Sequence, residues 1–427
     1  MSASYRRVYA WPVVVFGVVL SASPGSPVLG GTASESAPLT LEEVQRLVLD
    51  EQPALVAEAA SGRAFQAEAI AAGQLPDPQL IAGISQVPVE GSEALSLRDD
   101  DFTALSVGLA QEFPRAEKRE LRAALLAGRA DGSAQALAGL ARRLRLESGR
   151  AYLEVVAAAE GARLIEASEA EALRQRDAAG INLVAGHNDQ AQLLAATVEA
   201  AVAADRARAF RQREQAGRAV LARWIGPAAD GPVDPAVPVL PGPPALGVLV
   251  DALSAHPDVA RPATDATVAA TELRLARAAL KPDWRMEVRY DHRLEYPDLV
   301  TLMIGVDLPV FAADRQDRSS AAALQRLSAA GAERDDRLRE ATATVTVAYR
   351  QWEAGRERLN RFDDSLLPPG TARVDAALAS YRAGRGALSA VLEARRSLLE
   401  ARLMRLELAI DVARQRLQLQ YFEMETE

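Results

Sequence analysis

The sequence contains no cysteine, and only 5% of its 427 residues are aromatic. Without cysteine the chain has no means of forming a disulfide, a thiolate metal site, a cysteine nucleophile or a lipid anchor on an N-terminal cysteine. Few aromatics beside abundant alanine, leucine, arginine and glutamate favour long helices over a compact β-rich core. The formal net charge of −9 disfavours nucleic-acid binding, because a phosphate backbone requires a basic footprint.

Side chains that usually carry chemistry are also scarce. The three histidines, His187, His256 and His292, lie far apart and lack the spacing of metal ligands. Met286 and Met303 are isolated, so they do not indicate a methionine copper site. The sequence has neither a glycine-rich phosphate loop nor a nucleophile elbow. It therefore predicts no metal site, no cofactor and no enzymatic activity.

The first residues resemble an export signal. Arg6 and Arg7 precede an apolar run over residues 8–20, and small residues follow at 21–23. The alternative is a transmembrane anchor, but a spanning helix needs ~20 apolar residues and this run is shorter. We therefore interpret residues 1–23 as a secretory signal peptide. The mature protein is then periplasmic, secreted or part of the outer membrane.

The order of sequence features recurs at a distance of about two hundred residues. The recurring landmarks are the pairs Pro53 and Pro257, Pro76 and Pro282, Pro114 and Pro309, and Gly186 and Gly384. Their offsets are 257 − 53 = 204, 282 − 76 = 206, 309 − 114 = 195 and 384 − 186 = 198. This order predicts a two-fold repeat, with halves at 39–225 and 245–422, a proline- and glycine-rich linker at 226–244 and a tail at 423–427.

Each half contains two segments with the pattern of a β-strand, at residues 77–87 and 102–113 and at residues 283–292 and 299–309. In the third segment, Trp284, Met286, Val288 and Tyr290 alternate with Arg285, Glu287, Arg289 and Asp291. Such period-two alternation places apolar and charged side chains on opposite faces. A segment of ~9–11 residues crosses a bilayer as a tilted strand, and apolar-out, polar-in alternation is typical of outer-membrane barrels. The alternative is a soluble sheet packed on a helix.

If the strands enter a membrane, their charged side chains face the lumen of a barrel. The predicted lumen-facing residues are Arg285, Glu287, Arg289, Asp291 and Asp307. Acidic residues alternate with arginines, so the predicted lining is mixed rather than selective. Four strands are too few to close a barrel, and an open edge in lipid leaves backbone groups unpaired. The membrane hypothesis therefore requires several copies to share one barrel.

Long helical patterns cover residues 116–184 and 309–383, and a segment of that length would extend roughly 100 Å. Pro368 and Pro369 predict a kink in the later pattern. Returning helices follow each pattern, which predicts two antiparallel hairpins. Small residues at their tips could simply be turns, because glycine tolerates a positive φ. The alternative is that the tips also form a docking surface.

Several motifs resemble those of TolC-type outer membrane efflux proteins, and the resemblance covers residues 39–422. The motifs are Leu75-Pro76-Asp77-Pro78, Gln111-Glu112-Phe113-Pro114, Ser380-Tyr381-Arg382-Ala383-Gly384 and Val391-Leu392-Glu393-Ala394. The resemblance implies a mainly α protein with a membrane β part. A homotrimer would share a 12-stranded β-barrel in the outer membrane, and its helical hairpins would build a periplasmic α-barrel.

The same resemblance implies a passive conduit in the outer membrane that extends into the periplasm. It would receive substrate from an inner-membrane pump of the resistance–nodulation–division (RND) type through a periplasmic adaptor, or membrane fusion, protein. The hairpin tips would meet the adaptor and form a closable entrance. The tip residues are Ala185, Gly186, His187, Arg382, Gly384, Arg385 and Leu388.

A finer resemblance is to the heavy-metal branch, whose pumps export copper and silver or cobalt, zinc and cadmium. It depends on Leu75-Pro76-Asp77-Pro78 together with Val87-Pro88-Val89, and on Lys281-Pro282-Asp283-Trp284 together with Gln316-Asp317-Arg318. One alternative is a drug or small-molecule channel of the same type. Another is a soluble periplasmic coiled-coil adaptor or scaffold, although an adaptor would have one hairpin inserted in a β domain rather than two.

Overall fold

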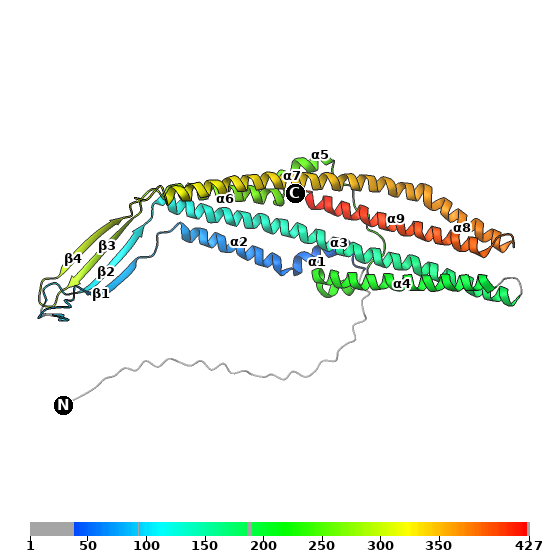
Figure 1. Ribbon diagram of the computed structural model, residues 1–427, viewed down its shortest axis with the longest axis horizontal. Coiled ribbons are helices and arrows are strands. Elements are labelled where there is room, and N and C mark those ends of the chain that lie inside the picture. Colours follow the sequence, from blue (N-terminus) through cyan, green and yellow to red (C-terminus); the bar gives the residue numbers. More distant parts are fainter. Residues whose placement is uncertain (1–37, 93, 99, 186–189, 425–427) are drawn as a thin grey trace, which may run out of the picture. The chain divides into compact units, whose positions relative to one another are not determined.

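The computed structural model describes residues 38–92, 94–98, 100–185 and 190–424. The predicted signal peptide, Gly186 and His187 lie outside the described residues. The helices are α1 (Leu41–Glu51), α2 (Pro53–Ala72), α3 (Ala116–Val184), α4 (Gln190–Ile225), α5 (Leu246–Ala252), α6 (Pro257–Ala278), α7 (Gln316–Arg361), α8 (Leu367–Arg382) and α9 (Leu388–Phe422), and the strands are β1 (Gln79–Ser85), β2 (Ala104–Phe113), β3 (Trp284–His292) and β4 (Leu299–Val306). Figure 1 shows these elements in order along the chain.

The four strands form one antiparallel sheet in the order β1-β2-β3-β4. In its register Leu109 lies opposite Val288, which lies opposite Leu302, so these apolar side chains share one face. The predicted fourth strand is too long, because β4 ends at Val306 rather than at residue 309. Asp307 donates its N–H to the carbonyl of Asp283 (3.2 Å), the residue just before β3, at the edge of the sheet nearest the helices. Asp307 therefore lies one residue beyond the end of β4, and the prediction that it belongs to the strand is wrong.

The helices next to the sheet pack in the order α2-α3-α6-α7, and those farther from it pack as α4-α3-α9, with α9 against α7 and α8. Because α3 runs through both groups, it joins them into one layer (Figure 1). The main hydrophobic core lies where the groups meet. Its fully buried side chains include Val44, Leu153, Leu221, Leu253, Leu417 and Leu419.

The second long helix is interrupted by a wide turn at Phe362–Leu366, just before Pro368 and Pro369. There the N–H of Leu367 bonds to the carbonyl of Phe362, five residues back. Proline lacks an N–H and its ring crowds the preceding turn, so the regular helix is interrupted just before the pair, and α8 carries both prolines in its first turn. The predicted kink therefore lies at this turn, and the ribbon bends between α7 and α8 (Figure 1).

In each hairpin a glycine of one helix faces a side chain of the paired helix at close range. A Cβ atom at Gly161 of α3 would overlap the ring of Phe210 on α4. A Cβ atom at Gly355 of α7 would lie 2.6 Å from Val412 Cγ2 on α9. The absence of a side chain at these two positions therefore sets the separation of the paired helices.

Candidate functional site: the sheet faces and the hairpin tips

One face of the sheet carries exposed apolar side chains from all four strands. Leu80 is 73% exposed and Leu302 is 61% exposed, although both belong to regular strands. At the end of this face nearest the helices, the rings of Phe113 and Trp284 stack with centroids 4.1 Å apart. Tyr290, which is 44% exposed, lies near the opposite end. An apolar face bounded by aromatic rings has the chemistry of a lipid-facing surface.

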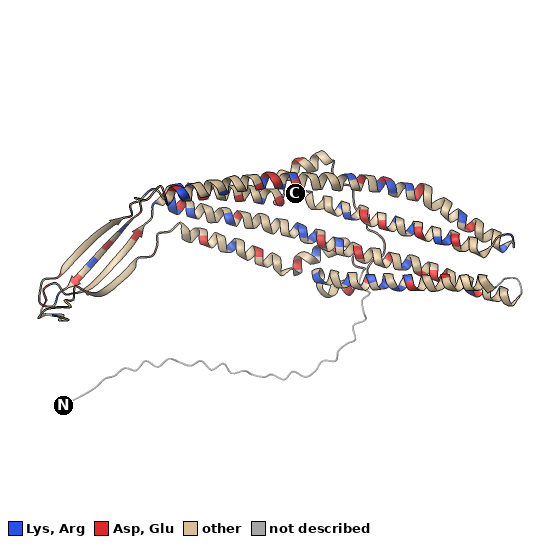
Figure 2. Cartoon of the chain, in the orientation of Figure 1, with Lys and Arg blue, Asp and Glu red and all other residues tan. Residues whose placement is uncertain are grey.

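The opposite face is polar, and the structure places Arg285, Glu287, Arg289 and Asp291 together on it. Figure 2 shows the alternating charges along β3. Asp291 is buried and accepts hydrogen bonds from Ser106 on β2 (2.5 Å) and Thr301 on β4 (3.1 Å). Its carboxylate therefore ties three strands together.

Glycines on the polar face make room for the arginines. Gly108 lies opposite Arg289 and Gly305 lies opposite Arg285 in the register. A Cβ atom at Gly305 would lie 2.8 Å from Arg285 Nε, and one at Gly108 would lie 3.2 Å from Arg289 Cβ. Both guanidinium-bearing side chains therefore pack beside glycine instead of projecting past bulky neighbours. Period-two alternation places these residues on one face but does not pair them, so sequence reasoning missed this arrangement.

The two arginines differ in their electrostatic environment. Arg289 forms ion pairs with Asp291 (3.1 Å) and Glu287 (3.7 Å). Within the part of the chain that the structure describes, the side chain of Arg285 forms neither a hydrogen bond nor an ion pair, although its backbone is paired in the sheet. The polar face therefore carries charges of both signs. Its arginine charge is paired with carboxylates near the middle and outer end of β3 and unpaired at Arg285.

The motif Lys281–Trp284 lies where α6 passes into β3. Lys118 of α3 donates to the carbonyl of Lys281 (2.6 Å) and to Asp283 Oδ2 (2.8 Å), and the N–H of Arg115 donates to Asp283 Oδ1 (2.9 Å). Partial burial raises the pKa of Asp283, but the hydrogen bonds from Lys118 and Arg115 outweigh it and hold this pKa below its usual value. The motif therefore connects the sheet to the helices.

The hairpin tips are only partly described. Ala185 caps α3 by donating its N–H to the carbonyl of Ile181 (3.0 Å). At the other tip Arg382 ends α8, Gly384 adopts a φ of +71°, and the N–H of Arg385 bonds to the carbonyl of Ser380 (3.0 Å). The positive φ explains why glycine occupies position 384.

Leu388 differs from the other tip residues because its side chain is buried, with 3% exposed. It packs with Ala179 of α3 and Ala196 of α4 in a small apolar cluster. In this structure Leu388 therefore joins the tip of the second hairpin to the first hairpin.

Ion pairs continue this connection along the hairpins. Arg395 of α9 contacts Glu171 of α3 (2.8 Å), and the neighbouring Arg396 contacts Glu199 of α4. The hydrogen bond and charge of Glu199 raise the pKa of Arg396. These partners lie 224 and 197 residues apart in the sequence, so no local pattern could reveal them.

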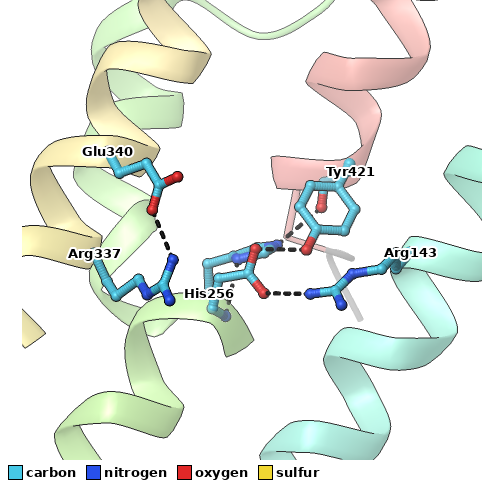
Figure 3. Close-up of polar contacts among 6 residues, drawn as sticks. Arg143, His256, Arg337, Glu340 and Tyr421 are labelled. Carbon is cyan, nitrogen blue, oxygen red and sulfur yellow. Dashed lines mark hydrogen bonds and ion pairs between the residues drawn. The ribbon is translucent and has the colours of Figure 1, made fainter. Parts of the chain in front are cut away.

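A charged cleft of about 690 Å³ lies among α3, α6, α7 and the end of α9. On one side Asp258 accepts a hydrogen bond from the Tyr421 hydroxyl (2.5 Å) and lies 3.8 Å from Arg143 (Figure 3). On the other side Arg337 pairs with Glu340 on α7 (2.8 Å). The charged side chains of Asp258, Arg337 and Glu340 therefore have partners within the cleft.

Among the described residues, no three or more histidine, aspartate or glutamate side chains come together in a way that could hold a metal ion. Among the described helices, none combines the length and the apolar character needed to cross a membrane.

Neither a protein-family model nor a curated protein matches the sequence. Several solved structures do match. The outer membrane protein VceC of Vibrio cholerae has 16% identity and a TM-score of 0.74, with 90% of this chain and 95% of that chain covered. CusC has 14% identity and a TM-score of 0.76, with 90% and 91% covered. The CmeC outer membrane channel of Campylobacter jejuni has 12% identity and a TM-score of 0.76, with 95% and 93% covered.

At these identities the likeness establishes the fold. The prediction of a mainly helical chain with a four-stranded sheet, arranged as in TolC-type channels, is confirmed.

Proposed function

We propose that this protein is the outer-membrane channel component of a tripartite efflux system and acts as a passive, non-enzymatic conduit. The observation that carries the proposal is the two-faced sheet. Its apolar side chains are exposed on one face, and a hydrogen-bonded charged network occupies the other. A barrel wall between lipid and water needs this division.

The edges of the sheet support closure of the barrel by further copies of the chain, and the resemblance implies a homotrimer. In the described chain β1 pairs only with β2 and β4 pairs only with β3, so each end strand has one unpaired side. Unpaired backbone groups in lipid cost several kcal/mol each, which favours closure by further copies. Three copies would supply a 12-stranded barrel, and the helices would continue it into the periplasm as an α-barrel.

The outer helices of the hairpins have complementary surfaces. On α4, Leu194, Val198 and Val202 are 56%, 62% and 43% exposed at successive turns. On α8 the exposed residues at helical spacing include the alanines 372, 376 and 379. Large apolar side chains on one helix interdigitate well with small side chains at the facing positions of another. This match supports contact between α4 of one copy and α8 of the next.

The tips are the proposed docking site for a periplasmic adaptor, which would connect the channel to an inner-membrane RND-type pump. The proposed contacts are Ala185, Gly186, His187, Arg382, Gly384 and Arg385, whereas the buried Leu388, which was also expected at the docking surface, holds the second tip to the first hairpin instead. The exposed Arg382 and Arg385 supply positive charge at a turn whose backbone is held by its own hydrogen bonds. The order of elements, which occurs twice along the chain, supports the proposed two-fold repeat.

For the cargo we propose heavy-metal ions, on the strength of the motif resemblance, with drugs or other small toxic compounds as the second candidate. The residues of the motif Lys281–Trp284 hold the sheet to the helices, so cargo selection is assigned to the pump rather than to this motif. In a strain that expresses the partner pump, deletion of this chain should lower metal tolerance. Lowered drug tolerance with unchanged metal tolerance would favour the second candidate.

Neighbouring residues on β4 provide a direct test of the channel. Leu302 lies on the apolar face and Met303 on the charged face opposite Glu287. Leu302→Arg should reduce the amount of heat-stable trimer in the outer membrane, because an arginine in the lipid costs about 2–4 kcal/mol near the midplane. Met303→Arg is the matched control, and it should assemble normally while changing the ion selectivity of the channel in planar bilayers.

The proposal fails if both arginine variants accumulate equally in the outer membrane. It also fails if the unaltered protein is recovered as a soluble monomer in periplasmic extract, which would favour the adaptor or scaffold alternative.

A further inference from the structure

The two halves of the chain use different side chains for the same connection. Gln52 precedes Pro53 at the start of α2, and its Nε2 donates to the carbonyl of Trp224 near the end of α4 (2.9 Å). His256 precedes Pro257 at the start of α6, and its Nε2 lies 3.0 Å from the carbonyl of Tyr421 near the end of α9. We call these contacts the first junction and the second junction.

The correspondence is close in the sequence as well as in space. Gln52 and His256 differ by 256 − 52 = 204 positions, and their carbonyl partners differ by 421 − 224 = 197. In each case a helix that begins with proline is tied to the end of a returning helix. The difference is chemical, because a glutamine amide does not titrate near neutral pH and an imidazole does.

The surroundings of His256 require its neutral form. The carbonyl of Tyr421 can only accept, so Nε2 carries the hydrogen. The N–H of Asp258 can only donate, and it points to Nδ1 (3.3 Å), which must therefore be unprotonated. The ring is fully buried between Tyr421 and Phe422, with centroid distances of 5.0 Å to each.

Charged groups from every packed element face this junction. On α6, Asp258 is engaged by the Tyr421 hydroxyl and by Arg143 of α3. Arg142 of α3 donates to the carbonyl of Tyr421 (3.4 Å). At the end of α9 Arg416 pairs with Glu423 (2.8 Å), and across the cleft Arg337 pairs with Glu340 on α7 (2.8 Å). Figure 3 shows His256 between the labelled side chains of α3, α7 and α9.

These groups do not compensate a buried imidazolium. Burial lowers the pKa of His256 most. The hydrogen bond to Tyr421 and the charge of Asp258 act in the opposite direction, the charge of Arg142 acts with burial, and the net result is a lowered pKa. The folded chain therefore disfavours the proton that a solvent-exposed histidine would accept.

We propose that protonation of His256 opens the second junction, so that acid separates the end of α9 from α6 while the first junction stays closed. A proton on Nδ1 removes the acceptor for the N–H of Asp258, and with it the side-chain cap of α6. It also leaves a positive charge in a buried site beside Arg142. The end of α9 then separates from α6, whereas Gln52 keeps α4 joined to α2.

The direction of the pH effect follows from proton binding. Above the ordinary histidine pKa of 6.5, His256 is neutral in both the closed and the open junction, and the closed junction has its full stability. Below 6.5 the open junction binds a proton that the closed one does not, so acid favours opening. A single proton permits at most about a tenfold increase in the opening equilibrium for each pH unit.

Hydrogen–deuterium exchange on the full chain, purified in detergent, tests the proposal. It measures the opening of each junction between about pH 7.5 and about pH 5, after correction for intrinsic exchange. Peptides that contain Tyr421 should show an opening equilibrium that rises by up to about tenfold per pH unit below 6.5. Peptides that contain Trp224 should remain level. Equal pH profiles at the two helix ends would overturn the proposal.

The first junction supplies a matched variant. His256→Gln copies the first junction into the second and should make the Tyr421 peptides insensitive to acid while Asp258 is unchanged. An acid response that persists in this variant would assign the effect to Asp258 and overturn the proposal. If His256→Gln does not fold, the unaltered chain still decides, because Tyr421 peptides that keep the same opening equilibrium at about pH 7.5 and about pH 5 would overturn the proposal.

Discussion

The two long hairpins have similar geometry but differ in the side chains that join their helices. The buried residues of α4 in the first hairpin are mainly alanines, at positions 196, 200, 203 and 207. In the second hairpin the residues buried between α8 and α9 are larger and include Val374, Ala394 and Leu398. We call the packed surface between α3 and α4 the first seam and that between α8 and α9 the second seam. The helices of the first seam can approach closely, whereas the second seam buries more apolar area.

The difference extends to the helices themselves. α3 is continuous over 69 residues, whereas α7 and α8 are separated by the wide turn before Pro368. A seam of small residues tolerates little change in helix separation, because no flexible side chain can take up the error. A seam of leucines can adjust by rotamer changes. Local irregularity therefore occurs in the hairpin whose packing can absorb it.

The largest expected effect comes from shrinking the second seam. Leu398→Ala should lower the free energy of unfolding by about 3 kcal/mol, because it removes a buried side chain and leaves a cavity. Urea unfolding of the chain in detergent would measure the loss. Leu398→Met, which nearly preserves the volume, should cost less than about 1.5 kcal/mol. Equal values for the two variants would show that this seam is not tightly packed.

Enlarging the first seam should cost somewhat less. Ala200 is buried, and Ala200→Leu should lower the free energy of unfolding by about 2 kcal/mol through overpacking. Thermal unfolding followed by circular dichroism would detect it. The exposed Ala201→Leu is the matched control and should have little effect. If Ala200→Leu were harmless, the first seam would be as adaptable as the second.

Two glycines sharpen the comparison at the level of a single methyl group. Gly161→Ala forces a methyl group against Phe210 and should cost about 1–2 kcal/mol of stability. The double variant with Phe210→Ala should relieve that clash in a double-mutant cycle. Gly331→Ala on α7, where no atom lies within 4 Å of the added Cβ, should instead stabilise the helix by about 0.5–1 kcal/mol.

The smallest expected effect concerns the contact between the hairpins. Arg395→Gln removes the ion pair with Glu171, whose side chain is 40% exposed, and should cost less than about 1 kcal/mol. The loss should shrink as salt is raised, because ions screen partly exposed charges. Proteolysis rates near the tips at low and high salt would measure it. A salt-independent loss would mean that packing of the arginine stem matters more than its charge.

Strand faces and most helix bounds were predictable because they depend on local spacing. The alternation from Trp284 to Asp291 identified the apolar and charged faces of β3, and the long helical pattern over 116–184 matches α3. The pattern predicted over 309–383 begins too early, because α7 starts at Gln316. The contacts Gly305 with Arg285 and Arg395 with Glu171 were not predictable. The first requires the strand register, and the second requires two helices that are distant in the chain to lie together.

The histidine at position 256 illustrates the same limit. In the sequence it is an isolated residue before a proline, without metal-ligand spacing. In the structure it is buried against Tyr421, which lies 165 residues away, and it occupies the place that Gln52 holds in the first half. Its pKa is lowered by that burial first and by the charge of Arg142 second, against the opposing effects of Tyr421 and Asp258.

By itself the sequence determined the periodicity of each element, the places where proline and glycine end it, and the order in which elements recur. These properties depend on backbone sterics and on the alternation of side chains over a few residues. The tertiary structure alone decided which strands pair, which helices share a seam and which of two matching junctions contains a buried titratable ring. Those outcomes depend on contacts between distant residues, whose free energies are set by burial and by partners that no local spacing specifies.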